Sequence, residues 1–168
     1  MDEPARIVVQ LAHVLSGVLW IGGAYYTMLV QLPAVESLPL PARGPALAAI
    51  GPRQVRYILR VAELTLATGV LQILVGGRGG ELQTPFGTRW STAIVIGIVA
   101  ALVGYGLLRG ALKPAITKLL AAAPAAMKGD ETAAAQVPKL RNRIRTVGRL
   151  QMALGALILA AMITARFS

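Results

Sequence analysis

The chain has 168 residues, of which 55% are hydrophobic and only 14% are charged, and its mean hydropathy is +0.64. Soluble domains carry about 25% charged residues, so this composition excludes an ordinary soluble domain and predicts an integral membrane protein. There is no cysteine, which excludes disulfides, thiolate metal sites, c-type haem attachment and thiol nucleophiles. The basic residues behind the net charge of +10 lie between apolar runs, so we attribute them to loops facing the cytoplasm and expect no nucleic-acid binding.

The apolar runs predict an all-α fold, an integral membrane four-helix bundle that forms a single transmembrane domain over residues 1–168. A membrane-spanning helix needs about 20 apolar residues. We expect spans at about 7–32, 53–77, 89–109 and 147–166, and an interfacial helix at about 113–127. Pro33 should end the first span. Residues 33–52, rich in Pro, Ala and Gly, should then form the first loop, with room for a short helix near 44–50.

The distribution of Lys and Arg predicts the topology. Four of the 17 basic residues lie before the first span, in the second loop or at the C-terminus, and thirteen lie in the first and third loops and the adjoining helix ends. Because basic loops tend to stay in the cytoplasm, we expect these two loops inside and both chain termini on the outer side. The protein would then be a multi-pass protein of the inner (cytoplasmic) membrane.

Glycines recur at seven-residue spacing in three predicted spans. The pairs are Gly69 and Gly76, Gly97 and Gly104, and Gly148 and Gly155. Small residues at such intervals let membrane helices approach closely. The pattern therefore predicts a compact bundle and favours a homo-oligomer, with the general enrichment of glycine in membrane helices as the alternative explanation.

His13 is the only histidine of the chain and lies about one and a half turns inside the first span. Ionisable groups at such depth are costly, which makes them candidates for a functional site. Three roles are open: a structural hydrogen bond to a neighbouring helix, for example through Gln72; a ligand to haem iron or copper through a neutral ring nitrogen; and a proton relay. On the second span, Thr65, Thr68 or Gly69, and Gln72 form a stripe of polar and small residues.

Glu63 is the one acidic residue inside a predicted span. Acids in membrane helices usually pair within the bundle. We therefore expect a structural ion pair with Arg60, one turn earlier, or with Arg109 or Arg149 at the same depth.

The stretch HVLSGVLWIGG, residues 13–23, resembles the first-span signature of the copper-resistance protein D superfamily, in which a helix begins His-x-Leu and continues to Trp-x-Gly-Gly. The related HemJ-type protoporphyrinogen oxidases are four-span proteins with the same pattern. The end of the third span, YGLLRGALK at 105–113, and the start of the fourth, GRLQMALG at 148–155, are also similar to members of this superfamily.

The resemblance implies haem b held within the bundle, with His13 as its axial ligand. One histidine cannot supply both axial ligands, so the sixth position would be empty, filled by water or by Met162, or supplied by His13 of a second copy. Packing is the competing role for Met162. Trp20 would stack on the porphyrin, unless it is a packing residue.

Three further residues complete the candidate cofactor site. Arg78 and Arg89 lie on the same side as His13 and would pair with the haem propionates, unless they are ordinary loop charges. Gln72 lies at a similar predicted depth to His13.

The expected function is therefore a haem b-binding membrane protein in electron transfer, haem handling or redox sensing. Its partners would be the lipid bilayer and a redox protein or a quinone. The oxidases have a lysine and a second histidine in the third span, where this chain has Ile94 and Gly106, so an oxidoreductase activity of that kind is left open. The alternatives are copper transport or tolerance, which usually uses clustered Met, His or Cys ligands, and a non-catalytic membrane scaffold.

Overall fold

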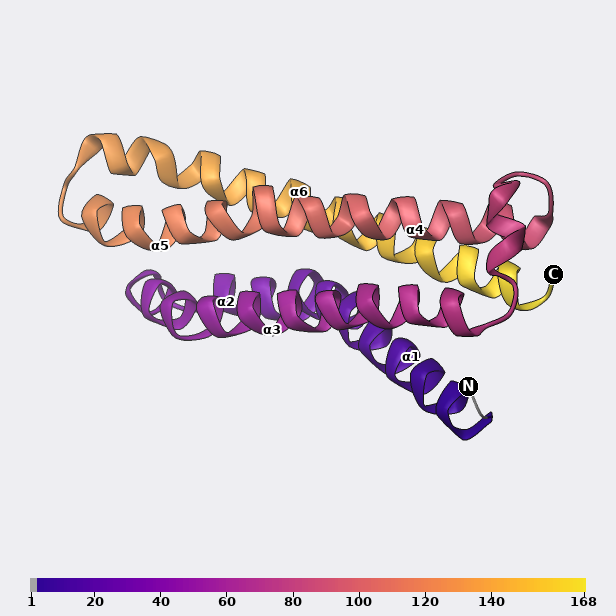
Figure 1. Ribbon diagram of the computed structural model, residues 1–168. Coiled ribbons are helices and arrows are strands. Elements are labelled where there is room, and N and C mark those ends of the chain that lie inside the picture. Colours follow the sequence, from indigo (N-terminus) through magenta and orange to yellow (C-terminus); the bar gives the residue numbers. More distant parts are fainter. Residues whose placement is uncertain (1–2) are drawn as a thin grey trace.

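The structure is a computed structural model that describes residues 3–168, and every element in that range is a helix (Figure 1). In chain order the elements are α1 (Glu3–Tyr26), η1 (Thr27–Gln31), α2 (Leu32–Ser37), α3 (Leu40–Val75), η2 (Gly79–Gln83), α4 (Arg89–Leu107), η3 (Leu108–Leu112), α5 (Lys113–Met127) and α6 (Glu131–Arg166). The π-helical turns η1 and η3 join α1 to α2 and α4 to α5, so the chain forms four long helices. All four are long and apolar enough to cross a membrane, which indicates a multi-pass membrane protein.

The four long helices form two antiparallel hairpins. In the first hairpin α1 lies against α3, and in the second α6 lies along both α4 and α5. The hairpins meet mainly where α3 contacts α5 and where α1 contacts α6. The N- and C-termini lie at one end of the bundle, and the α5–α6 turn lies at the other (Figure 1). The prediction of an all-helical bundle is confirmed, and its four long helices have the length and apolar composition that crossing a membrane requires.

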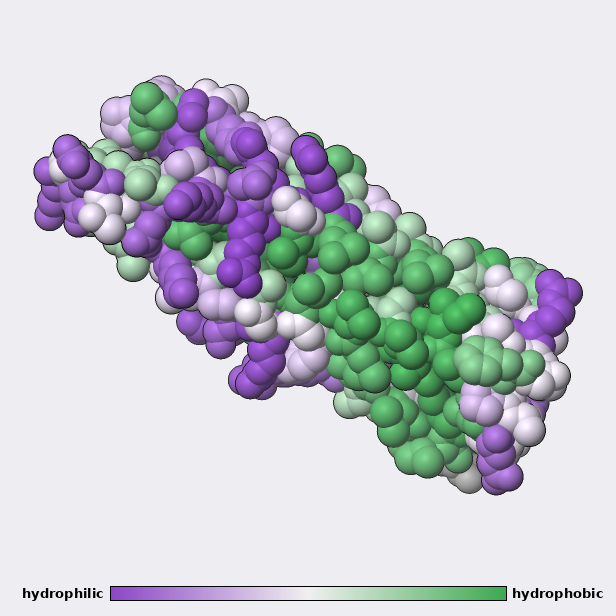
Figure 2. Space-filling view, turned by 90° about the horizontal axis from the view of Figure 1, so that it is seen from above, coloured by the Kyte–Doolittle hydropathy of each residue, from purple (hydrophilic) through white to green (hydrophobic). Residues whose placement is uncertain are grey.

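The helices are longer than a bilayer is thick. The 36 residues of α3, like those of α6, span about 54 Å, whereas the hydrocarbon core measures about 30 Å. Hydrophobic side chains gather over one part of the surface and hydrophilic ones over the end with the α5–α6 turn (Figure 2). We call residues 7–31, 57–75, 90–108 and 150–165 the apolar half, and residues 32–56 and 109–149 the basic half, which holds twelve of the 17 Lys and Arg residues.

The predicted first loop at 33–52 is wrong, because only Leu38 and Pro39 separate α2 from α3. Pro33 was expected to end the first helix, since a proline ring clashes with the carbonyl four residues earlier. The helix instead widens into the π-turn η1 just before Pro33, which makes room for the ring. The same construction recurs in the second hairpin, where η3 precedes Pro114.

Residues 113–127 form a helix, α5, with the predicted bounds. However, α5 continues the line of α4 and lies along α6, so it runs along the bundle rather than across it (Figure 1). The last helix also begins earlier than the apolar stretch alone indicates: α6 starts at Glu131, where the Asp130 side chain accepts a hydrogen bond from the Ala133 amide at 2.9 Å. This N-cap satisfies one of the free amides of the first turn.

The seven-spaced glycines lie where helices approach one another. A Cβ at Gly97 would overlap the Met162 methyl, and one at Gly148 would overlap the sulfur of Met28. At Gly155 a Cβ would lie 2.9 Å from Ile21 Cγ2. Gly69 and Gly104 also face side chains of neighbouring helices, whereas Gly76 faces only the backbone of its own last turn. The prediction of close helix approach is therefore confirmed at five of these six glycines.

Candidate functional site

His13 lies on α1 and faces α3. Its Nδ1 is 3.0 Å from the carbonyl oxygen of Thr65 and 3.4 Å from the hydroxyl of Thr68, which itself donates to the carbonyl of Leu64 at 2.6 Å. A carbonyl can only accept, so Nδ1 must carry the proton and donate it to Thr65. In the neutral ring this leaves Nε2 as the nitrogen with a free lone pair.

The imidazole is seated on the bare backbone of Gly69. A Cβ built there would lie 3.0 Å from Cε1 and 3.3 Å from Nδ1 of His13, so any larger residue would displace the ring. The antiparallel register of α1 and α3 continues on both sides of this seat. Arg6 donates to the carbonyl of Gly76 at 3.2 Å, and a Cβ on Gly17 would lie 3.7 Å from Thr65 Cγ2.

The second ring nitrogen, Nε2, has no hydrogen-bond partner within residues 3–168. The His13 side chain is half-buried, and no fully buried side-chain nitrogen or oxygen in that range lacks a partner. On the same face of α1, Gln10 one turn earlier is exposed, whereas Ser16 and Trp20 on the following turns are buried. The free lone pair therefore lies at the edge of the packed interior and is not fully enclosed.

Thr65, Thr68 and Gly69 of the predicted polar stripe on α3 lie next to His13. The residue expected to form the hydrogen bond with His13 was the wrong one. A hydrogen bond to a neighbouring helix was expected through Gln72. The bond instead goes to the backbone carbonyl of Thr65, two turns from Gln72. The half-buried Gln72 lies nearer the chain termini, since the register that pairs Arg6 with Gly76 brings it close to the level of Gln10.

The other candidates inside the bundle are packing residues in this structure. Trp20 is only 4% exposed and belongs to the core cluster formed with α3 and Leu108. Met162 places its methyl against Gly97 of α4. His13 contacts α3 whereas Met162 contacts α4, so no contact in the described chain brings the two proposed axial ligands together.

Arg78 is engaged in the α3–α4 connection. Its Nε lies 2.5 Å from Oε1 of Glu81 and its Nη2 3.1 Å from Oε2, and its guanidinium lies 4.5 Å from the ring centre of Trp90. These hydrogen bonds hold the pKa of the Glu81 carboxyl below its ordinary value and raise the pKa of Arg78. The propionate role expected for Arg78 would compete with this pair. Arg89, the first residue of α4, is exposed.

The predicted ion pair of Glu63 is confirmed. Its Oε1 accepts from the hydroxyl of Tyr105 at 3.1 Å and from Arg109 at 3.5 Å, and its Oε2 lies 3.7 Å from Arg60. Tyr105 belongs to α4 and Arg109 to η3, so this group of side chains links α3 to the second hairpin. A second interhelical bond was not predicted: the buried Gln151 of α6 donates to the carbonyl of Gly104 at 2.6 Å.

Two cavities of the bundle lie away from His13. One of about 80 Å³ lies in the basic half between α2, α3, α5 and α6, and one of about 10 Å³ lies beside Trp20 and Gln151. Sites for drug-sized ligands occupy about 300–1,000 Å³, so neither could enclose a porphyrin. The donor chemistry of His13 fits an axial ligand, and a macrocycle bound to its Nε2 would lie outside these two cavities.

Two further observations bear on ligands. Within residues 3–168 no group of three or more His, Cys, Asp and Glu side chains is arranged to hold a metal ion. No family model matches the chain, and no curated protein or solved structure matches it either.

Proposed function

We propose that the protein is a membrane protein that binds haem b through His13, for electron transfer, haem handling or redox sensing. The observation that supports this proposal is the 3.0 Å hydrogen bond from Nδ1 to the Thr65 carbonyl, which leaves the lone pair of Nε2 free to bind a metal. Histidines that bind metals almost always donate their other ring N–H to a carbonyl, carboxylate or water, because this fixes the tautomer and the ring orientation. Haem, when bound, supplies one-electron redox chemistry, for which a quinone or a redox protein would be the partner.

The contacts of α1 indicate where a haem bound to His13 would lie. Before Trp20, α1 contacts α3, whereas α6 is contacted by Ile21 and Tyr25 of α1 and by Met28 of η1. A porphyrin bound to Nε2 would lie outside the packed interior, and its far side would be covered by lipid or by a second copy of the chain. We therefore include a homo-oligomer in the proposal. For Met162 to act as the sixth ligand, its side chain would have to leave its contact with Gly97.

We also propose the orientation that the charges favour. Twelve of the 17 basic residues lie in the basic half, so that half would face the cytoplasm of an inner-membrane protein. The two termini lie at the opposite end and would be on the outer side, with His13 in the outer half of the bilayer. Labelling of a cysteine introduced at Ser168, with a reagent that cannot cross the membrane, tests this orientation.

The haem proposal is tested by titrating haem into the purified protein in detergent and following the Soret band. We expect one saturable site that His13→Ala removes, whereas Gln10→Ala, one turn earlier on α1, leaves it intact. Equal haem binding by the wild type and His13→Ala would refute the proposal. Bound copper in elemental analysis, without a Soret band, would favour the copper alternative instead.

A specific observation favours a second candidate, a non-catalytic scaffold in which His13 only joins two helices. The ring packs against Gly69 and is bonded to Thr65, and neither of the two cavities described above is large enough for a porphyrin. A folded wild-type protein that takes up neither haem nor copper, and that is destabilised by His13→Ala, would support this candidate.

A further inference from the structure

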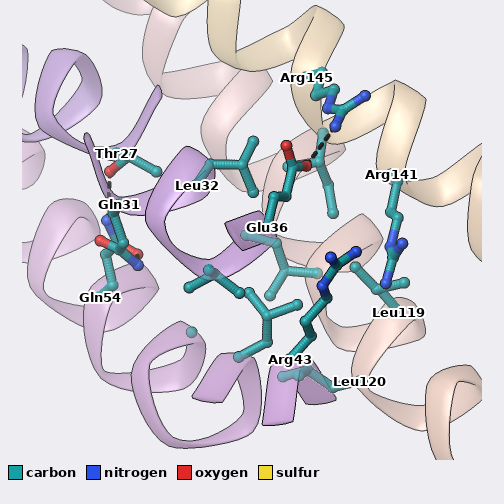
Figure 3. A pocket seen from close by; sticks show the side chains of 15 residues that line it. Thr27, Gln31, Leu32, Glu36, Arg43, Gln54, Leu119, Leu120, Arg141 and Arg145 are labelled. Carbon is teal, nitrogen blue, oxygen red and sulfur yellow. Dashed lines mark hydrogen bonds and ion pairs between the residues drawn. The ribbon is translucent and has the colours of Figure 1, made fainter. Parts of the chain in front are cut away.

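The larger cavity lies in the basic half, where α2, α3, α5 and α6 meet (Figure 3). Its volume is about 80 Å³. Aliphatic side chains from these helices make up its walls: Leu32, Val35, Leu47, Leu119, Leu120 and Ile144. An apolar cavity of about 150 Å³ stays dry and takes up benzene, so this smaller one has room for a few carbon atoms of an aliphatic chain.

Three arginines stand around this aliphatic interior, and their charges are not equally compensated. Arg145 forms an ion pair with Glu36. Arg43 donates its Nε to the carbonyl of Leu38 at 2.8 Å, which leaves its two terminal nitrogens free, and Arg141 has no carboxylate within 4.0 Å in the described chain. The guanidinium groups of Arg43 and Arg141 lie on the same side of the cavity (Figure 3). Two guanidinium groups on one side of a cavity, neither paired with a carboxylate, favour the binding of an anion.

The cavity extends from the border of the apolar half into the basic half. The apolar stretch of α6 begins at Leu150, and Arg145 and Arg141 precede it by about 8 and 14 Å at 1.5 Å per residue. Thr27 and Gln31, in the last turns of the apolar part of the first helix, border the other end of the cavity. Headgroup layers extend roughly 5–8 Å beyond the hydrocarbon core, so this end of the cavity and Arg145 lie at headgroup depth, while Arg141 lies beyond the layer and its long side chain can reach back to it.

We propose that this cavity binds an anionic phospholipid from the leaflet at the basic end of the bundle. Arg43 and Arg141 hold the phosphate, for which the planar guanidinium group has the matching geometry. The first carbons of one acyl chain fill the aliphatic interior. Basic pockets between membrane helices are suited to anionic headgroups, and a free phosphate ion would leave the aliphatic walls uncovered. This site is independent of His13 and of the proposed haem.

Native mass spectrometry of the detergent-purified protein tests the site, with phosphatidylglycerol and phosphatidylcholine of identical acyl chains as probes. We expect the wild type to retain one phosphatidylglycerol and to prefer it over phosphatidylcholine. The double variant Arg43→Gln/Arg141→Gln should bind it about 30-fold more weakly, the equivalent of about 1 kcal/mol for each arginine. The single variant Arg141→Gln, at an exposed position, should lose about fivefold and guards against misfolding of the double variant.

The matched control is Arg53→Gln/Arg56→Gln. It removes the same charge from exposed positions of α3 that do not line the cavity, and we expect it to bind phosphatidylglycerol normally. Equal losses in the two double variants would refute the site, because they would show a general attraction to a basic surface. Equal retention of the two lipids by the wild type would refute it as well.

A second comparison separates a lipid from a free anion. Lysophosphatidylglycerol, which has one acyl chain, should bind far more tightly than glycerol phosphate, and Leu120→Phe, which fills part of the cavity, should weaken the lipid alone. If glycerol phosphate binds as tightly as the lysolipid and Leu120→Phe has no effect, the site holds a free anion and the lipid proposal is wrong.

Discussion

Replacing His13 by asparagine, glutamine or alanine distinguishes the roles of its two ring nitrogens. The amide nitrogen of asparagine can occupy the position of Nδ1 and donate to the Thr65 carbonyl, but asparagine has no atom at the position of Nε2. Glutamine reaches the position of Nε2 and loses the donor at Nδ1. Asparagine and histidine have similar helix propensities, so His13→Asn changes little besides the ligand atom.

The structure sets the size of the effects on stability. Removing the 3.0 Å bond to Thr65 should cost about 0.6 kcal/mol, the average for interhelical hydrogen bonds in membranes, and up to about 1.7 kcal/mol. Alanine also loses the contact of the ring with Gly69 but gains some helix propensity, so His13→Ala should destabilise by about 0.5–1.5 kcal/mol. His13→Asn should lie close to the wild type. For a chain of this size, 1 kcal/mol corresponds to a shift in Tm of about 2–4 °C.

Thermal unfolding in detergent, followed by tryptophan fluorescence, measures this series alongside the haem titration. We expect Asn to preserve Tm and abolish the Soret band, whereas Gln and Ala should lower Tm. If Asn lowers Tm as much as Ala, the bond to Thr65 does not stabilise the α1–α3 pair. Retention of haem by His13→Asn would show that Nε2 is not the ligand.

Two further predictions concern the loop and the glycines. Because the pKa of Glu81 is lowered, its ion pair with Arg78 is fully present above the ordinary carboxyl pKa and is lost as the pH falls through the lowered value. Arg78 lies over the ring of Trp90, so the tryptophan fluorescence of the wild type should change in this acid range. The fluorescence of Glu81→Gln should not change there. Gly155→Ala should lower Tm by several degrees, since its Cβ would lie 2.9 Å from Cγ2 of Ile21, a branched side chain that cannot easily move away, at a cost of about 1–3 kcal/mol. Gly106→Ala, with open space around its Cβ, should leave Tm unchanged or slightly raised, and equal effects of the two substitutions would contradict the packing described for α1 and α6.

The membrane-crossing helices and their close contacts could be predicted from the sequence, because both depend on local composition. An uncharged run from Ile7 to Leu32 has to be a membrane helix in a chain of this hydropathy. Glycines spaced by seven residues return to nearly the same face of a helix, so Gly97 and Gly104 both point at a neighbour. Likewise Glu63 needed a partner at its own depth, and the arginines available there were few.

The extent of the helices could not be predicted from hydropathy. Helix formation depends on backbone hydrogen bonds and on residue propensity, and the basic half is rich in Ala, Leu, Arg and Lys, which favour helices in water as well. The charges were therefore assigned to loops although they lie on helices. The cavity between these helices was missed for the same reason, because Arg43 and Arg141 were assigned to separate loops.

The partner of His13 illustrates another limit. Gln72 was the candidate because its side chain is visibly polar in an apolar run. The actual acceptor is a main-chain carbonyl, and every residue of α3 has one, so the sequence does not single it out. Thr68 gives the only local clue: its hydroxyl bonds back to Leu64 and also approaches Thr65 O at 3.2 Å, so it adds a polar group beside the carbonyl that His13 reaches.

The border between the two halves is marked by bonds between helices and not by the ends of helices. At the border Gln54 of α3 donates to the hydroxyl of Thr27 and accepts from Gln31 at 2.6 Å, and about 14 Å further along α3, inside the apolar half, Glu63 accepts from Tyr105. Groups of this kind need partners inside the protein wherever water is absent, because an unpaired polar group in hydrocarbon costs several kcal/mol. Because these groups are paired, the helices continue from the apolar half into the basic half without a break, even at Pro33, which follows the π-turn η1. Hydropathy therefore locates the membrane border in this chain, whereas proline does not.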